Sequence, residues 1–347
     1  METATASPSV THSDSASTVE KPRCILLAGS ARGGTSWAHK VIDSHPSVHG
    51  CHEPFHQLAA KEQHRSLFTR IKAGQGDETD AASLMSLLAS PGLLTQKPPF
   101  FPKDHLIAPA WMRSLAWAAA RTFAPAESVY NLLSKGKLGS GQCVVVKNRP
   151  YPQLERILEV LDADVLMLLR HPCAVVNSWL RGIQMGVMDA NSIDPAYTWK
   201  AYSEYITQLG YAESEIRDMP AAGLLAVQWL VDTMLINQYR QNPCMSTHTV
   251  VYEDLVKNPE SEWKRVFEWL RLPFSASVVR FLNESSQPGF DIRKLLGSRY
   301  TYFSVQRANT SPVDSWKSKM DPANLKLVMD IVSPQFPIEL YWPGEST

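Results

Sequence analysis

The segment Cys24–Trp37, CILLAGSARGGTSW, predicts a strand, a tight turn and the start of a helix. An apolar run ends at Gly29, and small residues fill most of the turn that follows. Glycines such as Gly33 and Gly34 let backbone N–H groups approach an anion, and the amino end of a helix favours negative charge. We therefore predict an anion-binding loop, with Arg32 as a charged donor inside it.

The loop departs from the nucleotide-hydrolase pattern G-x-x-x-x-G-K-[ST] at the lysine. Counted from the first glycine, the second falls correctly at Gly34, but Thr35 stands in the lysine position. The nearest lysine, Lys40, lies well down the helix that Thr35, Ser36 and Trp37 begin. The metal-binding half of the pattern is therefore not matched. The loop by itself is compatible with a magnesium-free anion site or with a glycine turn that binds nothing.

Three further apolar runs resemble buried parallel strands: CVVVK from Cys143, DVLMLLR from Asp164 and HTVVYED from His248. Helical patterns separate the runs, which predicts an α/β fold of three layers, with a central parallel sheet and a P-loop-like first unit. In such sheets ligands bind at the carboxyl ends of the strands. All four predicted ends carry polar or small residues: Gly29-Ser30, Lys147-Asn148, Arg170 and Tyr252-Glu253.

Residues 1–21 are rich in serine, threonine and alanine, which predicts a disordered tail. We expect 22–347 to form one domain in which 60–141 is a helical cap or insertion. Within that cap, 111–126 is apolar but holds Arg113 and Arg121, so we expect a buried helix rather than a membrane span. Further helices are expected after the loop that follows Tyr252, with Trp263, Phe267 and Leu270 on one face, and over about 322–332.

Charge, cysteines and the amino-terminal residues restrict the environment and the partners. The 34 basic and 34 acidic side chains balance, so no global field attracts nucleic acid or an anionic membrane. The first residues lack the apolar run of a signal peptide. The five cysteines have no spacing typical of a metal or redox site. We expect a cytoplasmic protein without a nucleic-acid or membrane partner.

A second candidate anion site lies in LLRHPCAVVNS, residues 168–178. Arg170 ends a predicted strand, and Pro172 suits the first position of a helix. Ser178 is about two turns into that helix, on the face that looks back to Arg170. A guanidinium and a hydroxyl placed in this way can bind a terminal phosphate. A simple ion pair of Arg170 at the strand end is the alternative.

Together these segments resemble the sulfotransferases that use 3′-phosphoadenosine 5′-phosphosulfate (PAPS). GSARGGTSW is similar to the family's 5′-phosphosulfate loop, LLRHPCAVVNS to its 3′-phosphate motif, VVYEDLVKNP to the segment whose tyrosine lies by the adenine, and DSWKSKMDP to its carboxyl-terminal W-K segment. The resemblance spans Cys24 to about Phe336, in family order. This chain differs in having Gly33 for Ser, Ser36 for the second Thr and His171 for the usual Asp.

The resemblance implies PAPS as co-substrate and no metal. It implies donor-binding residues Arg32, Gly33, Gly34, Thr35, Ser36, Trp37, Arg170, Ser178 and Tyr252. Arg32 and Lys147 would take the charge that develops on the leaving 5′-phosphate. Four histidines, His45, His49, His52 and His56, follow the loop, but a loop interrupted by proline and glycine is a poor metal site.

The acceptor needs a general base. Where soluble small-molecule sulfotransferases have the histidine of K-T-H, this chain has Arg149, which does not accept a proton. SHPSVHGCHEPF is similar instead to the acidic segment of the carbohydrate and tyrosyl-protein type, which makes Glu53 the predicted base. His52 and His56 are the alternatives, and a structural ion pair is the other role open to Glu53. His45, His49 and His105 are expected to be ordinary loop or surface residues.

The expected acceptor is a small metabolite or natural product with a hydroxyl or amine, since the chain shows no membrane anchor. A saccharide is the second choice, and a P-loop kinase or a nucleotide-binding protein without turnover are the alternatives of another class. We expect the cap, which holds Phe100, Phe101, Trp111 and Trp117, to line the acceptor pocket. Aromatic side chains such as these are more often core residues than ligand contacts, so none of the four is a predicted site residue.

Overall fold

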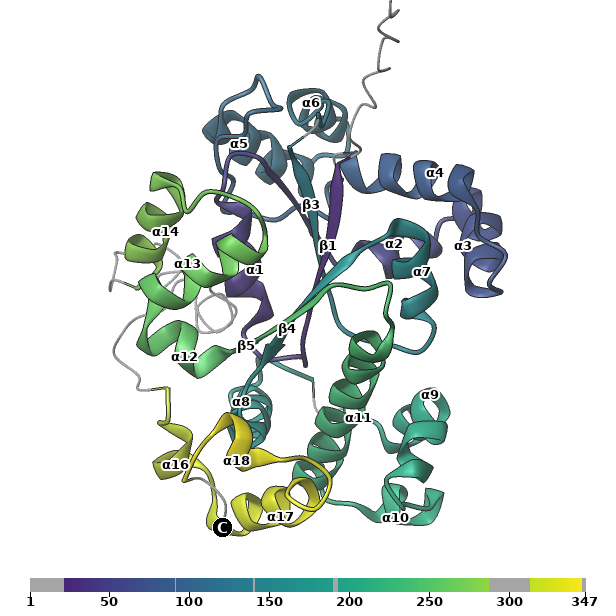
Figure 1. Ribbon diagram of the computed structural model, residues 1–347, viewed down its shortest axis with the longest axis vertical. Coiled ribbons are helices and arrows are strands. Elements are labelled where there is room, and N and C mark those ends of the chain that lie inside the picture. The colour runs from purple at the N-terminus through teal and green to yellow at the C-terminus, as the bar shows by residue number, and fades with distance from the viewer. Residues whose placement is uncertain (1–21, 91, 140, 190–192, 287–312, 345–347) are drawn as a thin grey trace, which may run out of the picture.

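Five parallel strands form the centre of the computed structural model, which describes residues 22–90, 92–139, 141–189, 193–286 and 313–344 (Figure 1). The predicted tail lies outside these residues. In chain order the strands are β1 (Arg23–Ala28), β2 (Val48–His52), β3 (Cys143–Asn148), β4 (Asp164–Leu169) and β5 (Thr247–Val251). Their order in the sheet is β2-β3-β1-β4-β5, and every neighbouring pair is parallel. The predicted α/β class is confirmed.

Strand β2 was missed, and the expectation that the histidine-rich stretch is a loop was wrong. Its sequence, VHGCH, has neither an apolar run nor a clear alternation. The strand is at the edge of the sheet, paired with β3, and its His49 side chain is in hydrogen-bond contact with Gln96 and His105. Gly50 is needed there, because a Cβ would come within 2.6 Å of the Asp43 carboxyl carbon. Only the packed structure explains why this segment is a strand.

Helices cover both faces of the sheet (Figure 1). Along β1, Ile25 and Leu27 face one core and Leu26 and Ala28 the other, as the two-residue period of a strand requires. The first core is built with α1 (Thr35–Asp43), α12 (Tyr252–Lys257), α13 (Pro259–Trp269) and α14 (Ala276–Ser286). The second is built with α2 (Pro54–Ala59), α3 (Arg65–Lys72), α4 (Glu78–Ala89), α7 (Leu154–Leu161) and the end of α11 (Ala221–Gln241).

A further core joins α11 to helices beyond the carboxyl end of the sheet. These are α8 (Pro172–Gln184), α9 (Pro195–Gln208), α10 (Glu213–Asp218), α16 (Trp316–Lys319), α17 (Pro322–Val332) and α18 (Ile338–Tyr341). The predicted bounds of α17 are confirmed. The buried face of Trp263, Phe267 and Leu270 is confirmed as well, but the loop expected after Tyr252 is the short helix α12.

The segment 60–141 holds η1 (Glu62–His64), α3, α4, α5 (Ala110–Ala120) and α6 (Ala126–Leu133). Helix α5 was expected to be buried, and only one face is: Arg113 is buried, while Trp111 and Leu115 are 63% and 64% exposed. Apolar residues lie on all sides of this helix, so the sequence does not show which side packs against the rest of the protein. Among the described helices, none combines the length and the apolar character needed to cross a bilayer.

Asp43 at the end of α1 carries a buried charge held by two buried ammonium groups. Lys40 Nζ lies 2.8 Å from one carboxylate oxygen and Lys103 Nζ 2.9 Å from the other. Burial alone would raise the pKa of Asp43, but Lys103 and Lys40 outweigh it and hold that pKa well below its usual value. The three side chains tie α1 to the segment 60–141.

We expect Asp43→Ala to lower the free energy of unfolding by about 3–5 kcal/mol, because two buried ammonium groups would lose their counter-charge. Urea unfolding measures this. The matched control is Glu213→Ala, which removes an exposed partner of Arg217 and should change stability by less than about 1 kcal/mol. Equal losses in the two variants would show that the buried triad does not stabilise the fold.

Candidate active site

A pocket of ≈1090 Å³ opens at the carboxyl ends of the strands. Each strand contributes to its wall, as the parallel arrangement predicts. The contributing residues are Gly29 after β1, Glu53 after β2, Lys147 and Asn148 at the end of β3, Arg170 after β4 and Tyr252 after β5. Glu253, by contrast, is buried and accepts hydrogen bonds from the His171 N–H (3.3 Å) and from Trp342 Nε1 (3.1 Å).

The predicted anion loop joins β1 to α1 with a backbone that only glycine allows at Gly34. Gly34 has φ 92°, and a Cβ there would lie 2.2 Å from the Tyr252 ring. In the first turn of α1 the Trp37 N–H donates to the Gly34 carbonyl at 3.1 Å, whereas the N–H groups of Thr35 and Ser36 have no backbone acceptor within the described residues and can face a ligand. Gly33 differs from the prediction: its N–H donates to the Ser30 carbonyl at 2.9 Å, and it is not part of the pocket wall. Gly33 shapes the turn.

Arg32 joins the two predicted anion sites. Its Nε donates to Ser178 Oγ at 3.3 Å, and its carbonyl oxygen accepts from Arg170 Nη1 at 2.9 Å. Arg32 itself has φ 67°, a left-handed conformation that costs energy for a non-glycine residue. Arg32 and Arg170 both line the pocket, whereas Ser178 is behind them. The structure thus brings Arg170 and Ser178 together through Arg32.

Aromatic packing fixes the position of the loop against β5 and α13. Tyr252 is buried, and its ring meets Trp37 edge-on, with ring centroids 6.1 Å apart. Trp37 also packs on Trp263 at 5.5 Å and donates from Nε1 to Ser285 Oγ at 3.2 Å. The Arg170 guanidinium lies 4.5 Å from the centroid of the Tyr252 ring. Tyr252 therefore supports both the glycine turn and Arg170.

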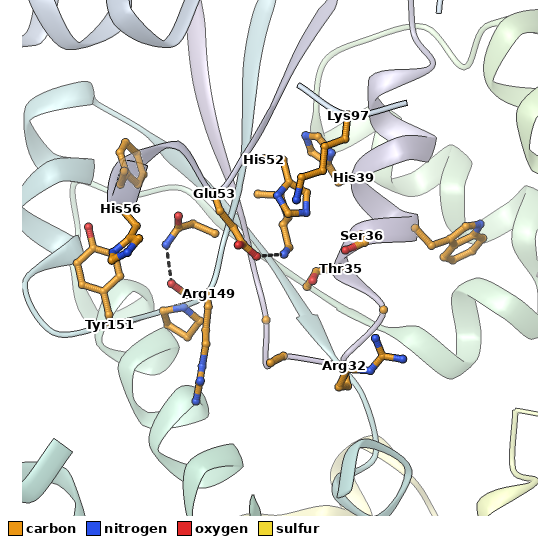
Figure 2. A pocket seen from close by; sticks show the side chains of 18 of the residues that line it. Arg32, Thr35, Ser36, His39, His52, Glu53, His56, Lys97, Arg149 and Tyr151 are labelled. Carbon is orange, nitrogen blue, oxygen red and sulfur yellow. Dashed lines mark hydrogen bonds and ion pairs between the residues drawn. The ribbon is translucent and has the colours of Figure 1, made fainter. Parts of the chain in front are cut away.

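Glu53 and Lys147 form an ion pair at the centre of the pocket (Figure 2). The Lys147 ammonium donates to the Glu53 carboxylate, and the Glu53 N–H donates to the Lys147 carbonyl at 2.7 Å. Glu53 has φ 51° and precedes Pro54, the first residue of α2, so the chain turns sharply there. The Glu53 side chain is 44% exposed and that of Lys147 only 10%. The two predicted catalytic residues are thus each other's partners.

Figure 2 shows Glu53 between two groups of side chains. Arg32, Thr35 and Ser36 of the anion loop lie on one side, and His56 and Tyr151 lie on the other. All of them line the same pocket. The pocket can therefore hold an anionic group at the loop and a second molecule at the opposite wall, with the ion pair between them.

Three imidazoles also reach the pocket. Burial lowers the pKa of His52 to about 2 and that of His39 to about 3, so both are neutral. Their Nδ1 atoms are buried without a hydrogen-bond partner among the residues described here. His56 is exposed on α2. His39 was missed from the sequence, although it is four residues after Thr35 and so on the same face of α1.

The histidines outside the pocket correct another expectation. His45 and His49 are buried, not on the surface. His49 sits between Gln96 Nε2 (3.1 Å) and His105 Nε2 (3.2 Å), and His45 Nδ1 accepts from the Ser47 N–H at 3.1 Å. The side-chain partners of His49 come from distant segments, which no local pattern reveals. Within the described ranges, no cluster of three His, Cys, Asp or Glu residues could hold a metal.

The segment 60–141 does reach the pocket wall, but none of its four aromatic residues named above lines it. Phe100 and Trp117 pack in a small separate core, and Phe101 packs on Phe281. Trp111 points to solvent. The segment 60–141 supplies Lys72, Lys97 and Pro98 to the pocket wall instead. Arg149, at the wall, is paired with the buried Asp232 at 3.0 Å.

A comparison with solved structures found several sulfotransferases. One is the sulfotransferase domain from the curacin biosynthetic pathway, which is 16% identical with a TM-score of 0.45, over 90% of this chain and 97% of that one. A mouse sulfotransferase complexed with PAP is 11% identical with a TM-score of 0.44, over 91% and 86% of the two chains. No curated relative matches the sequence.

The match to a family model is independent of these structures. The model described as "Sulfotransferase family" matches residues 22–276, which include all five strands, the anion loop, Glu53, Lys147 and Arg170. Because this match covers well over half of the 347 residues, the chain belongs to the sulfotransferase family.

Proposed function

We propose that this chain transfers the sulfuryl group of PAPS to a hydroxyl or amine of a small metabolite or natural product. The observation that carries the proposal is the Glu53–Lys147 ion pair, which lies between the anion loop and a separate wall of the same pocket. A base and a cation at this position suit an in-line displacement, in which acceptor and leaving group are on opposite sides of sulfur.

The donor would bind across the ends of β1, β4 and β5. The N–H groups of Thr35 and Ser36 at the start of α1 and the Arg32 guanidinium suit the 5′-phosphosulfate. Arg170, with Ser178 behind Arg32, suits the 3′-phosphate, and Tyr252 the adenine. The fit is supported by Gly34, where any Cβ would collide with the Tyr252 ring, so glycine lets this ring pack directly against the anion loop. Gly33 would act by shaping the turn.

In the reaction we propose, Glu53 accepts the proton of the acceptor as the acceptor oxygen or nitrogen bonds to sulfur. The bond between sulfur and the bridging oxygen breaks, and its electron pair goes to the 5′-phosphate of adenosine 3′,5′-bisphosphate (PAP). Lys147 and Arg32 offset the charge that develops there. This requires Lys147 to turn from Glu53 toward the donor, which frees the carboxylate for the proton.

The other candidate bases suit this step less well. Burial lowers the pKa of His52 to about 2, so it is a weak base. Arg149 is paired with Asp232 and carries no lone pair to accept a proton. His56 is exposed on the far wall and is the remaining alternative. A saccharide is the second candidate acceptor, because the segment around Glu53 resembles that of carbohydrate sulfotransferases.

Glu53→Gln should slow sulfuryl transfer by roughly 10²–10⁴-fold, because the amide cannot accept the acceptor's proton. PAP affinity should stay near normal. Radiolabelled PAPS measures the transfer rate, and calorimetry measures the affinity for PAP. Glu62→Gln, on the exposed η1, is the control and should change neither. Full activity of Glu53→Gln would assign the base elsewhere, and His56→Gln would then be the variant to assay.

Arg170→Ala should weaken PAP by roughly 10- to 100-fold, the worth of a hydrogen bond between charged groups. Adenosine 5′-phosphosulfate, which lacks the 3′-phosphate, should be affected far less. Competition binding against PAP compares the two ligands, and Arg217→Ala on the surface is the control. Equal losses for the two ligands would reject the assignment of Arg170 to the 3′-phosphate.

The alternative of a kinase is tested by ligand choice. We expect PAP to bind in the absence of magnesium, and ATP with magnesium to bind weakly, because Thr35 stands where a nucleotide hydrolase has its lysine. Calorimetric titration of the full chain measures both. Tight binding of ATP with magnesium and no binding of PAP would replace the sulfotransferase proposal by a nucleotide-binding one.

A further inference from the structure

Lys97 lies in the pocket near the reacting centre but comes from the segment 60–141, not from a strand end. Figure 2 shows it above the Glu53–Lys147 ion pair, beside His39 and His52. Desolvation by the surrounding protein lowers its pKa, Glu53 acts to raise it, and Lys147, Arg121 and Lys40 act to lower it further. No ion pair or hydrogen bond engages its ammonium within the described part of the chain.

The backbone before Lys97 is anchored to the end of β2. The His52 N–H donates to the Thr95 carbonyl at 2.7 Å. The next residue, Gln96, is buried: its side chain contacts His49 and accepts from the Tyr130 hydroxyl at 2.7 Å, and its carbonyl accepts from Trp117 Nε1 at 2.9 Å. These hydrogen bonds hold the backbone next to Lys97 in place, so the direction in which its side chain leaves the chain is fixed. Such support is typical of a side chain whose position matters for a ligand.

The other lysines of the pocket wall have different surroundings. Lys147 is paired with Glu53, and Lys40 with Asp43. Lys72 lies over the Tyr151 ring, 5.8 Å from its centroid, at the wall opposite the anion loop. Among the described residues, Lys97 combines closeness to the ion pair with an ammonium that lacks an acidic partner. An anion bound at the centre of the pocket would supply that partner.

We propose that Lys97 binds the sulfuryl oxygens of the donor and holds them during transfer. The inference rests on the proposed function and adds a catalytic residue to it. The moving group carries its charge on three oxygens around sulfur, and an ammonium offers three donors. Lys147 would stabilise the charge on the leaving oxygen, and Glu53 would accept the proton of the acceptor. Lys97 would donate hydrogen bonds to the sulfuryl group between them. Lys97 stays protonated, so the balance of the reaction is unchanged.

The test compares two ligands that differ only by the sulfuryl group. Lys97→Gln should weaken PAPS by roughly 10- to 100-fold, the range for a charge-assisted hydrogen bond, and leave PAP nearly unchanged. Lys97→Arg should recover part of the loss. The dissociation constants are measured by competition against labelled PAP, without an acceptor. Lys72→Gln is the matched control and should leave both ligands unchanged.

The outcomes distinguish a failure of the proposed sulfotransferase function from a failure of the role proposed for Lys97. A wild-type chain that binds neither PAPS nor PAP would overturn the proposed function, and with it this inference. Binding of both ligands by the wild type, with no loss in Lys97→Gln, would overturn the role of Lys97 alone. An equal loss of PAPS and PAP would also overturn it, because a contact to the sulfuryl group cannot weaken a ligand that lacks one.

Discussion

The parallel pairing of β1 with β3 on one side and β4 on the other is the constraint on which the rest of the site depends. It brings the anion loop after β1, Lys147 at the end of β3 and Arg170 after β4 to one edge of the sheet. Pairing of β2 with β3 adds Glu53, since His52 is in register with Lys147. Candidate site residues that are distant in sequence thus meet without any one segment containing the pocket.

The carboxyl edge of the sheet gathers many cationic side chains, and acidic partners offset part of that charge. Among the residues that the structure describes, seven cationic side chains line the pocket and Glu53 is the lining carboxylate. Two of those cations form ion pairs with buried carboxylates that do not line the pocket: Lys40 with Asp43 and Arg149 with Asp232. Burial raises the pKa of Asp232 although Arg149 opposes it, and a hydrogen bond from Ser30 connects the same carboxylate to the anion loop. Burial lowers the pKa values of His39 and His52 far enough that both are uncharged, so these two histidines add no repulsion.

The carboxyl-terminal segment completes the support of Arg170. Trp316 stacks on His171 with ring centroids 4.2 Å apart, and Trp342 donates to Glu253, which also accepts from the His171 backbone. Burial lowers the pKa of His171 to about 3, so a neutral ring fills the position where the family motif usually has an aspartate. The W-K segment identified in the sequence therefore packs against the strand end that carries Arg170.

The sequence by itself determined the elements whose side chains follow a regular period. The apolar runs of β1, β3, β4 and β5, the glycine turn at Gly34 and the proline start of α17 are local signals, because each depends on the backbone or the face of a single element. The tertiary structure decided the rest. Strand β2, the buried His49, the Glu53–Lys147 ion pair and the place of Lys97 all depend on partners far apart in the chain. A polar side chain in the sequence does not reveal whether it will meet water or a distant partner, and that difference determines whether it is on the surface, in the core or in the site.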